Sequence, residues 1–270
     1  MSHPLDGVWD KVKRANQQLD ALNKEWGDFV NDERNQFLAP FEVDPQSGWH
    51  LSQVGNFNPP LVRYSVMMGE VFYQLRSALD HLAWALVKAN HRKLIEGTTA
   101  FPIRVWPSYS IPFHTVNAVK GIRRAAIKII EEEQPYATGD RPSAEAHFLS
   151  VLKSFSDVDK HRTLYASAVV TPDVERLRGF YRVDPPTKRL IVKVLVKPGQ
   201  RLEAGTKVAR IWPGPFNPQQ KVYANGSFPL HVLFGDRPFG ARHAHRGGTW
   251  DVRDEVTALI RRFETFFPPR

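Results

Sequence analysis

The sequence predicts an α+β protein: an N-terminal antiparallel helical bundle with a small hairpin, then a C-terminal antiparallel β-sheet region and a final helix. Three observations support this class. Long stripes of apolar residues with helical spacing fill the first part of the chain. Beyond Ala166 short β-branched and aromatic runs alternate with Gly, Pro and Asn, and helical spacing returns near the C-terminus. We therefore expect a helical domain over residues 1–165 and a β-rich domain over residues 166–270. The final helix of the second domain is expected to pack back on the strands or on the helical domain.

The first expected elements are a helix, a hairpin and a second helix. Residues 5–36 predict one long helix, because its apolar residues recur at spacings of three and four: Val12, Ala15, Leu19, Leu22, Trp26 and Phe29. Turn residues at 44–48 lie between two apolar runs, 41–43 and 49–54, and this pattern predicts a β-hairpin. Pro59 and Pro60 then begin a second long helix over residues 61–91.

The rest of the chain completes the expected topology. Helices are predicted over residues 114–133 and 143–164, separated by Pro135. Four strands are predicted at 176–183, 190–196, 207–212 and 228–234. A last helix over residues 249–266 has one apolar face: Val252, Val256, Leu259, Ile260 and Phe263.

The composition of the chain excludes several kinds of functional site. Of 270 residues none is cysteine, which excludes disulfides, thiol nucleophiles and Cys-ligated metals. The first residues lack an apolar signal region, and no apolar run approaches the ~20 residues of a membrane span. We expect a soluble, cytoplasmic protein without membrane contact, cofactor or metal; His243 and His245 have the spacing of two ligands but no obvious third. The net charge of +9 favours an anionic partner such as RNA, although a basic solvated surface explains it equally well.

The second helix contains the candidate site. Its core face lies within about 60° of Leu75. The opposite face mixes ionisable, aromatic and small residues instead of the usual solvated Lys, Glu and Gln: Glu70, Tyr73, Ser77, Asp80, His81 and Trp84, with Arg76 at the edge. We infer that another helix, a second subunit or a ligand covers this face, and we expect a homodimer.

The helical spacing of these residues brings their side chains together in pairs. Arg76 and Asp80 are four residues apart and can form an ion pair, and Ser77 and His81 can form a hydrogen bond in the same way. Glu70 lies in one row with the second pair. A buried polar network that fixes helix register and a functional site both fit this pattern.

The fourth helix adds a possible buried carboxylate. Its apolar face, continued by one turn, includes Asp159, which would need a cation such as Arg76, Lys160 or Arg162. Alternatively, Ser156 and Asp159 form a capping box and a new helix begins there. Asp157 and His161 are four residues apart on the other side.

Several motifs resemble a family of uncharacterised bacterial proteins that is common in actinomycetes. They are GE-x2-Y-x-LRSALDHL at 69–82, FPI at 101–103, QPY at 134–136 and DKHR at 159–162, so the resemblance spans most of the chain. It implies shared organisation and no particular activity.

Arg76-x4-His81 on a long helix also resembles the R-x4–6-H motif of the HEPN superfamily. These are small, usually dimeric helical domains, and many are metal-independent ribonucleases with a composite site between two motif helices. The resemblance implies that Arg76 holds a phosphate and that His81 moves a proton. Glu70, Tyr73, Ser77, Asp80, Asp159, Lys160, His161 and Arg162 are then supporting residues. Two functions follow: an RNA-binding protein or ribonuclease of defence or toxin type, and a non-enzymatic dimer whose Arg/Asp/His network is structural or binds a small anion.

Overall fold

A computed structural model of the chain describes residues 3–32, 34–35, 37–92, 97–107, 112–161, 166–170, 180–187, 189–197, 200–224, 230–234 and 249–269. For residues 31, 159–161, 166–170, 230–234 and 249–251 the description covers the backbone alone. Helices and antiparallel sheets confirm the α+β class. The chain forms two compact units: unit 1 is Met1–Leu22, Tyr64–Leu164 and Gly235–Arg270, and unit 2 is Asn23–Arg63 and Tyr165–Phe234.

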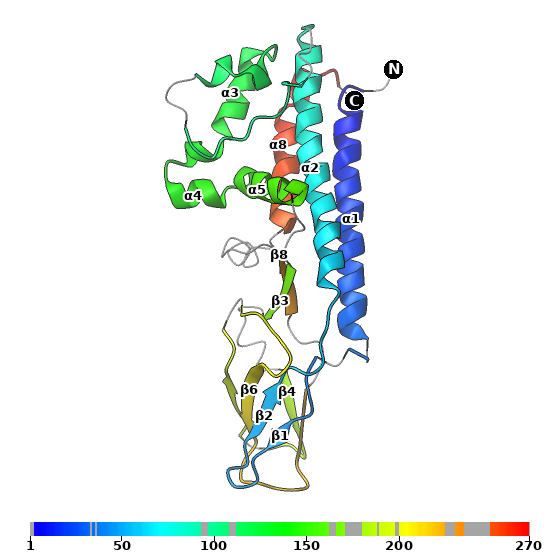
Figure 1. The fold of residues 1–270 in the computed structure, drawn as a ribbon, viewed down its shortest axis with the longest axis vertical. Coiled ribbons are helices and arrows are strands. Elements are labelled where there is room, and N and C mark those ends of the chain that lie inside the picture. Colours follow the sequence, from blue (N-terminus) through cyan, green and yellow to red (C-terminus); the bar gives the residue numbers. More distant parts are fainter. Residues whose placement is uncertain are drawn as a thin grey trace. The chain divides into compact units, whose positions relative to one another are not determined.

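Two long helices confirm the first helical predictions. α1 (Asp6–Asn31) and α2 (Leu61–Ala89) run antiparallel, as Figure 1 shows. The Gln18 amide donates to Glu70 (2.6 Å), and Arg63 binds Glu25 through Nε (2.6 Å). The first four residues of the predicted α1 stripe and the core face of α2 are buried, because each helix hides its apolar stripe: Val12, Ala15, Leu19, Leu22, Met68, Val71, Phe72, Leu75, Ala78, Leu79, Leu82 and Leu86.

Two further helices complete the core of unit 1 around α2. α5 (Phe148–His161) contacts α8 (Thr249–Arg262), whose predicted apolar face is buried from Val252 to Phe263. The Phe155 ring stacks on the Phe72 ring with centroids 4.5 Å apart, which fixes α5 against α2. This packing positions the side chains of the candidate site.

The middle of the chain is more broken than the sequence predicts. The helix expected over 114–133 is α3 (Arg124–Glu132), preceded by two 3-10 turns (Phe113–Thr115 and Asn117–Val119) and by Gly121 at φ 94°. The helix expected over 143–164 is two helices, α4 (Arg141–Ala146) and α5, because His147 is extended (ψ 140°) and its Nδ1 accepts the Leu149 N–H. α5 continues through Asp159, so the alternative interpretation, a capping box at Ser156 that begins a new helix, is wrong.

Unit 2 is a small β structure in which the predicted hairpin takes part. β1 (Glu42–Val43) and β2 (His50–Gln53) pair as expected, and β2 also pairs with β6 (Lys207–Trp212), which pairs with β5 (Ile191–Val194). All three pairings are antiparallel. Two further ribbons join β4 (Tyr181–Asp184) to β7 (Lys221–Ala224) and β3 (Ala166–Val170) to β8 (Leu230–Phe234).

The core of unit 2 contains residues from β4, β6 and β7. The Tyr181 hydroxyl donates to the buried Ser52 hydroxyl (3.0 Å), and the desolvated phenol has its pKa raised to about 12. The other core members are apolar or aromatic: Val54, Phe57, Phe180, Val196, Leu202, Val208, Ala209, Ile211 and Val222. Strands β3 and β7 are absent from the sequence prediction, although the turn signals Pro172-Asp173 and Asn225-Gly226 follow them in the sequence. Because both units combine separated segments, the division into domains at residue 165 stays a prediction.

Candidate functional site

The seven candidate residues of α2 have different surroundings in the chain. Ser77, Asp80 and Arg76 are half-buried, whereas Glu70, Tyr73, His81 and Trp84 are exposed. The Tyr73 and Trp84 side chains remain 55% and 38% exposed. The described part of a single chain therefore leaves this face of α2 partly exposed to solvent. That a second subunit covers the face stays a prediction.

Arg76 and Asp80 form the expected ion pair, and both also bind the backbone of an extended segment. Arg76 Nη2 donates to Asp80 Oδ1 (2.9 Å) and to the Phe101 carbonyl (2.7 Å). The same Asp80 oxygen accepts the Phe101 N–H (2.9 Å). One turn further along α2, the Trp84 indole donates to the Thr99 carbonyl (3.0 Å). These bonds fix the segment 99–101 along α2.

Gln134 holds the next part of the same segment. Its side chain is 1% exposed, accepts the Arg104 N–H (2.8 Å) and donates to the carbonyls of Pro102 (3.0 Å) and Ile130 (2.9 Å). Three of the four sequence motifs thus meet in space: LRSALDHL supplies Arg76 and Asp80, FPI supplies the bonded backbone, and QPY supplies Gln134. Their shared role in this structure is to anchor residues 101–104.

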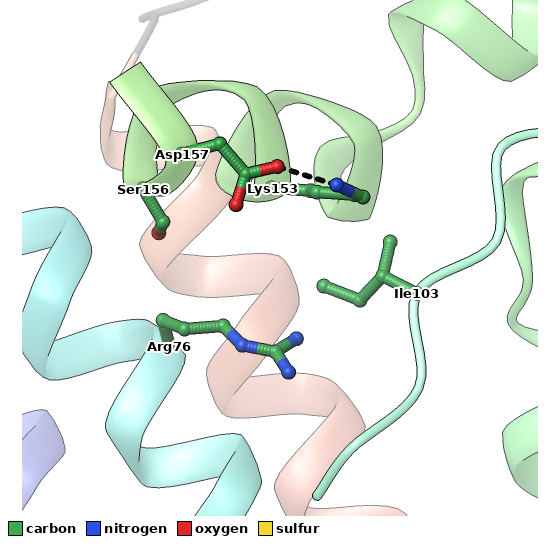
Figure 2. Close-up of a pocket in the computed structure, with 5 residues that line it drawn as sticks. All are labelled: Arg76, Ile103, Lys153, Ser156 and Asp157. Atoms are coloured by element: carbon green, nitrogen blue, oxygen red, sulfur yellow. Dashed lines mark hydrogen bonds and ion pairs between the residues drawn. The ribbon is translucent and has the colours of Figure 1, made fainter. Parts of the chain in front are cut away.

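A pocket of about 110 Å³ lies beside this network and is lined by Arg76, Ile103, Lys153, Ser156 and Asp157. Figure 2 shows the Arg76 guanidinium across the pocket from Lys153 and Asp157, which α5 contributes. Lys153 and Asp157 are one helical turn apart and form an ion pair with side chains 45% and 48% exposed. Both cations of the lining have a carboxylate partner, Asp80 for Arg76 and Asp157 for Lys153.

Ser156 is the unusual member of the pocket. The residue is 5% exposed, and its hydroxyl points from α5 toward Arg76 (Figure 2). Its Oγ has no hydrogen-bond partner among the described residues, although a buried hydroxyl normally has one. Arg76 makes both of its bonds through Nη2, so Nε and Nη1 have no partner in the described part of the chain. Three polar atoms of the pocket residues therefore have no partner in the described part of the chain.

His81 lies apart from this pocket. Five residues of helix rotate it about 140° from Arg76. Its Nδ1 lies 3.5 Å from the position that a Cβ on Gly7 of α1 would occupy. Between the described side chains of Ser77 and His81 the expected hydrogen bond is absent. The sequence interpretation of Arg76 and His81 as one catalytic pair thus receives no support from the geometry of a single chain.

The remaining predicted residues are scattered or lie outside the description. Glu70 accepts from Gln18, and the Tyr73 ring lies 5.7 Å from Lys11 Nζ. Asp159, Lys160 and His161 belong to α5, but their side chains are outside the described residues, as is all of Arg162. Asp157 has Lys153 as its ion-pair partner.

Sequence reasoning missed Lys153, Ser156 and Ile103 as pocket residues. Two signals could have found the first two. Lys153 and Asp157 have ion-pair spacing, and Ser156 is a hydroxyl next to the apolar stripe of Phe148, Leu149, Leu152 and Phe155. Ile103 belongs to the extended segment 101–104, and the sequence does not show that this segment is anchored to α2 and Gln134.

The described residues hold no group of three or more His, Asp or Glu side chains that could bind a metal ion. His243 and His245 lie outside the described residues. None of the described helices is long and apolar enough to span a bilayer. Comparison of the chain with protein-family models, curated proteins and solved structures finds no match.

Proposed function

We propose that unit 1 binds a small anionic ligand, such as a phosphate or carboxylate group, in the pocket between α2 and α5. The observation that carries the proposal is the buried Ser156 hydroxyl, which has no hydrogen-bond partner among the described residues and belongs to the same pocket as Arg76, whose Nε and Nη1 make no bond to them either. Leaving a buried hydroxyl without a partner costs about 1–3 kcal/mol, so a ligand that bonds to it recovers that cost.

The size of the pocket and its N–H donors support a small anion. A volume of 110 Å³ holds about three or four waters, or one compact oxyanion. Arg76 offers Nε and Nη1 in the planar arrangement that suits oxyanions. Lys153 can turn toward an anion at little cost, because its half-exposed pair with Asp157 contributes at most about 1 kcal/mol.

Thermal unfolding in the presence of inorganic phosphate, sulfate or acetate tests the proposal, because a ligand of the folded state raises the melting temperature as its concentration exceeds Kd. Ser156→Ala should weaken binding by about 2- to 10-fold, the value of one hydrogen bond, while leaving the unliganded protein as stable or slightly more stable. Ser154→Ala is the matched control, since Ser154 is exposed on the same helix and lies outside the pocket. Absence of saturable stabilisation by all three anions, or equal binding by Ser156→Ala, would falsify the proposal.

A HEPN-like ribonuclease dimer is the second candidate, favoured only by the exposure of His81. It needs a second subunit to bring a proton-transfer group to Arg76, because none of the described residues that line the pocket is a histidine. Its test is RNA cleavage in EDTA. Cleavage that is lost in His81→Ala supports the ribonuclease, whereas phosphate binding that is unchanged in His81→Ala supports the anion site.

A further inference from the structure

The outer face of the four-stranded sheet in unit 2 has an unusual row of side chains. In the register, Leu51 lies opposite Arg210, and Arg210 lies opposite Lys193. Their sequence neighbours His50 and Ile211 point inward and are 7% and 0% exposed. Because side chains alternate along a strand, Lys193 and Arg210 point outward, and both are exposed.

Two cations directly opposite each other repel and destabilise a sheet unless something offsets their charge. Neither Lys193 nor Arg210 has a carboxylate within ion-pair distance among the described residues. The nearby carboxylates keep their negative charge but bind other groups: Glu42 accepts from Gln53, and Asp44 accepts from Ser47 and Gln46, which together with Arg210 lower the Asp44 pKa. Because no carboxylate in the described part of the chain forms an ion pair with Lys193 or Arg210, both side chains can still bind a partner.

The surrounding sequence strengthens this charge. Residues 181–224 contain only two acidic residues, Asp184 and Glu203. The same segment contains nine basic ones: Arg182, Lys188, Arg189, Lys193, Lys197, Arg201, Lys207, Arg210 and Lys221. A polyanion is the partner that complements such a segment.

Two tryptophans lie beside the cations. Lys193 Nζ and the Arg210 guanidinium lie 5.1 Å and 5.5 Å from the centre of the Trp49 ring. The Trp212 ring is 6.5 Å from the Trp49 ring, and its indole N–H donates to the Ser47 carbonyl (3.1 Å). Both tryptophans are half-buried, so each is held by the fold and still presents ring surface.

We infer that this tryptophan face, made of Trp49, Lys193, Arg210 and Trp212, binds single-stranded nucleic acid. Lys193 and Arg210 bind backbone phosphates, and a base stacks on the Trp212 ring. This combination is favourable because phosphates neutralise the two opposed cations and flat bases cover the indole surface. Stacking on an indole ring does not depend on which base is bound, so we expect little sequence preference. A folded acidic protein or an anionic membrane could neutralise the cations but would not require the ring. The inference is independent of the anion pocket in unit 1.

Fluorescence anisotropy of a labelled 12-nucleotide oligouridylate with the full chain tests this, at ~50 mM salt, where phosphate contacts bind strongly. Lys193→Gln and Arg210→Gln should each weaken binding and reduce the slope of log K against log salt by about 0.7. Lys221→Gln is the matched control, because it removes the same charge from an exposed position on β7. Trp212→Leu should weaken binding by about 5- to 150-fold, the effect of losing one stacked base.

Trp212→Phe separates stacking from folding, since it keeps a ring but loses the bond to Ser47. It should bind within a few-fold of the wild type, and circular dichroism should show that both variants are folded. Three results overturn the inference: no binding at ~50 mM salt, an equal loss of affinity in Lys221→Gln and Lys193→Gln, or tighter binding of duplex RNA or phosphatidylserine vesicles that is unchanged in Trp212→Leu.

Discussion

Cationic side chains have different surroundings in the two units. In unit 1 Arg76 is paired with Asp80 and bonded to the Phe101 carbonyl, so its charge fixes the backbone. In unit 2 Lys193 and Arg210 lie over an indole ring without a carboxylate partner in the described residues. A net charge of +9 therefore indicates a partner only where the cations are not already paired. If this comparison is correct, removing polar groups should be costly in unit 1 and nearly free on the sheet face of unit 2.

The largest effect is expected at Gln134. Gln134→Ala leaves the Arg104 N–H and the carbonyls of Pro102 and Ile130 unbonded, so we expect a loss of about 3–5 kcal/mol in the free energy of unfolding. Gln134→Glu should be similarly harmful, because a carboxylate accepts the N–H but cannot donate to two carbonyls. Urea denaturation measures both, with the exposed Glu131→Ala as the control. A loss below ~1 kcal/mol would show that segment 101–104 does not depend on this side chain.

A backbone effect in unit 2 should be the next largest. Gly48 has φ 71°, and a Cβ there would lie 2.6 Å from the Gly214 carbonyl oxygen. Gly48→Ala should therefore cost about 2–3 kcal/mol. Gly27→Ala is the matched substitution, because Gly27 is inside α1 and nothing lies within 4 Å of the position of an added Cβ. It should raise the free energy of unfolding by roughly 0.5–1 kcal/mol. If Gly48→Ala is tolerated as well as Gly27→Ala, the turn that supports the tryptophan face is not rigid.

The ion pair of α2 should have an intermediate effect. Asp80→Ala removes the carboxylate that accepts from Arg76 and from the Phe101 N–H, and leaves Arg76 with the Phe101 carbonyl alone. Because the Arg76 and Asp80 side chains are 20% and 34% exposed, we expect the free energy of unfolding to fall by about 2 kcal/mol. In a double-mutant cycle, Arg76→Ala and Asp80→Ala should show a coupling energy of about 0.5–2 kcal/mol. Additive losses would mean that the pair contributes nothing beyond two separate side chains.

These residues also show which parts of the structure the sequence can predict. The apolar periodicity of the sequence predicted α1, α2, α8 and the core face around Leu75. It could do so because the buried face of a helix is formed by residues three and four positions apart in the sequence. The Arg76–Asp80 pair was predictable for the same reason, being one turn apart. The bonds of Asp80 to Phe101 and of Gln134 to Pro102 and Arg104 were not, since they join residues 21 to 32 positions apart.

The same limit applies to the β structure. Turn residues between two apolar runs predicted the hairpin at 41–54 but not its pairing with β6, because strand partners distant in sequence leave no local signal. Likewise, the sequence does not show that the Ser156 hydroxyl is buried without a partner among the described residues, because this depends on the packing of α5 beside α2.

A pH effect should be common to both units. Burial lowers the pKa of His50 in unit 2 and of His147 in unit 1. The folded protein therefore favours the neutral rings, and between the lowered pKa and the ordinary value near 6.5 the unfolded chain binds more protons. Stability should be full above this range and fall as the pH drops through it. Melting temperatures at neutral and mildly acidic pH should show a smaller drop in His50→Gln and in His147→Gln; equal drops in all three proteins would contradict the assignment.

The smallest effect is expected at Lys193. Lys193→Gln removes an exposed cation–π contact worth about 0.5–1 kcal/mol but also removes the repulsion from Arg210, about 0.2–1 kcal/mol. The two terms nearly cancel, so the free energy of unfolding should change by less than about 0.5 kcal/mol. The salt dependence of the free energy of unfolding distinguishes this cancellation from the case in which Lys193 contributes neither term. Because ions screen the repulsion between exposed charges, raising the salt from ~50 mM to ~500 mM should stabilise the wild type more than Lys193→Gln. A loss above ~1.5 kcal/mol would mean that Lys193 is as structural as Arg76, and the contrast between the two units would then disappear.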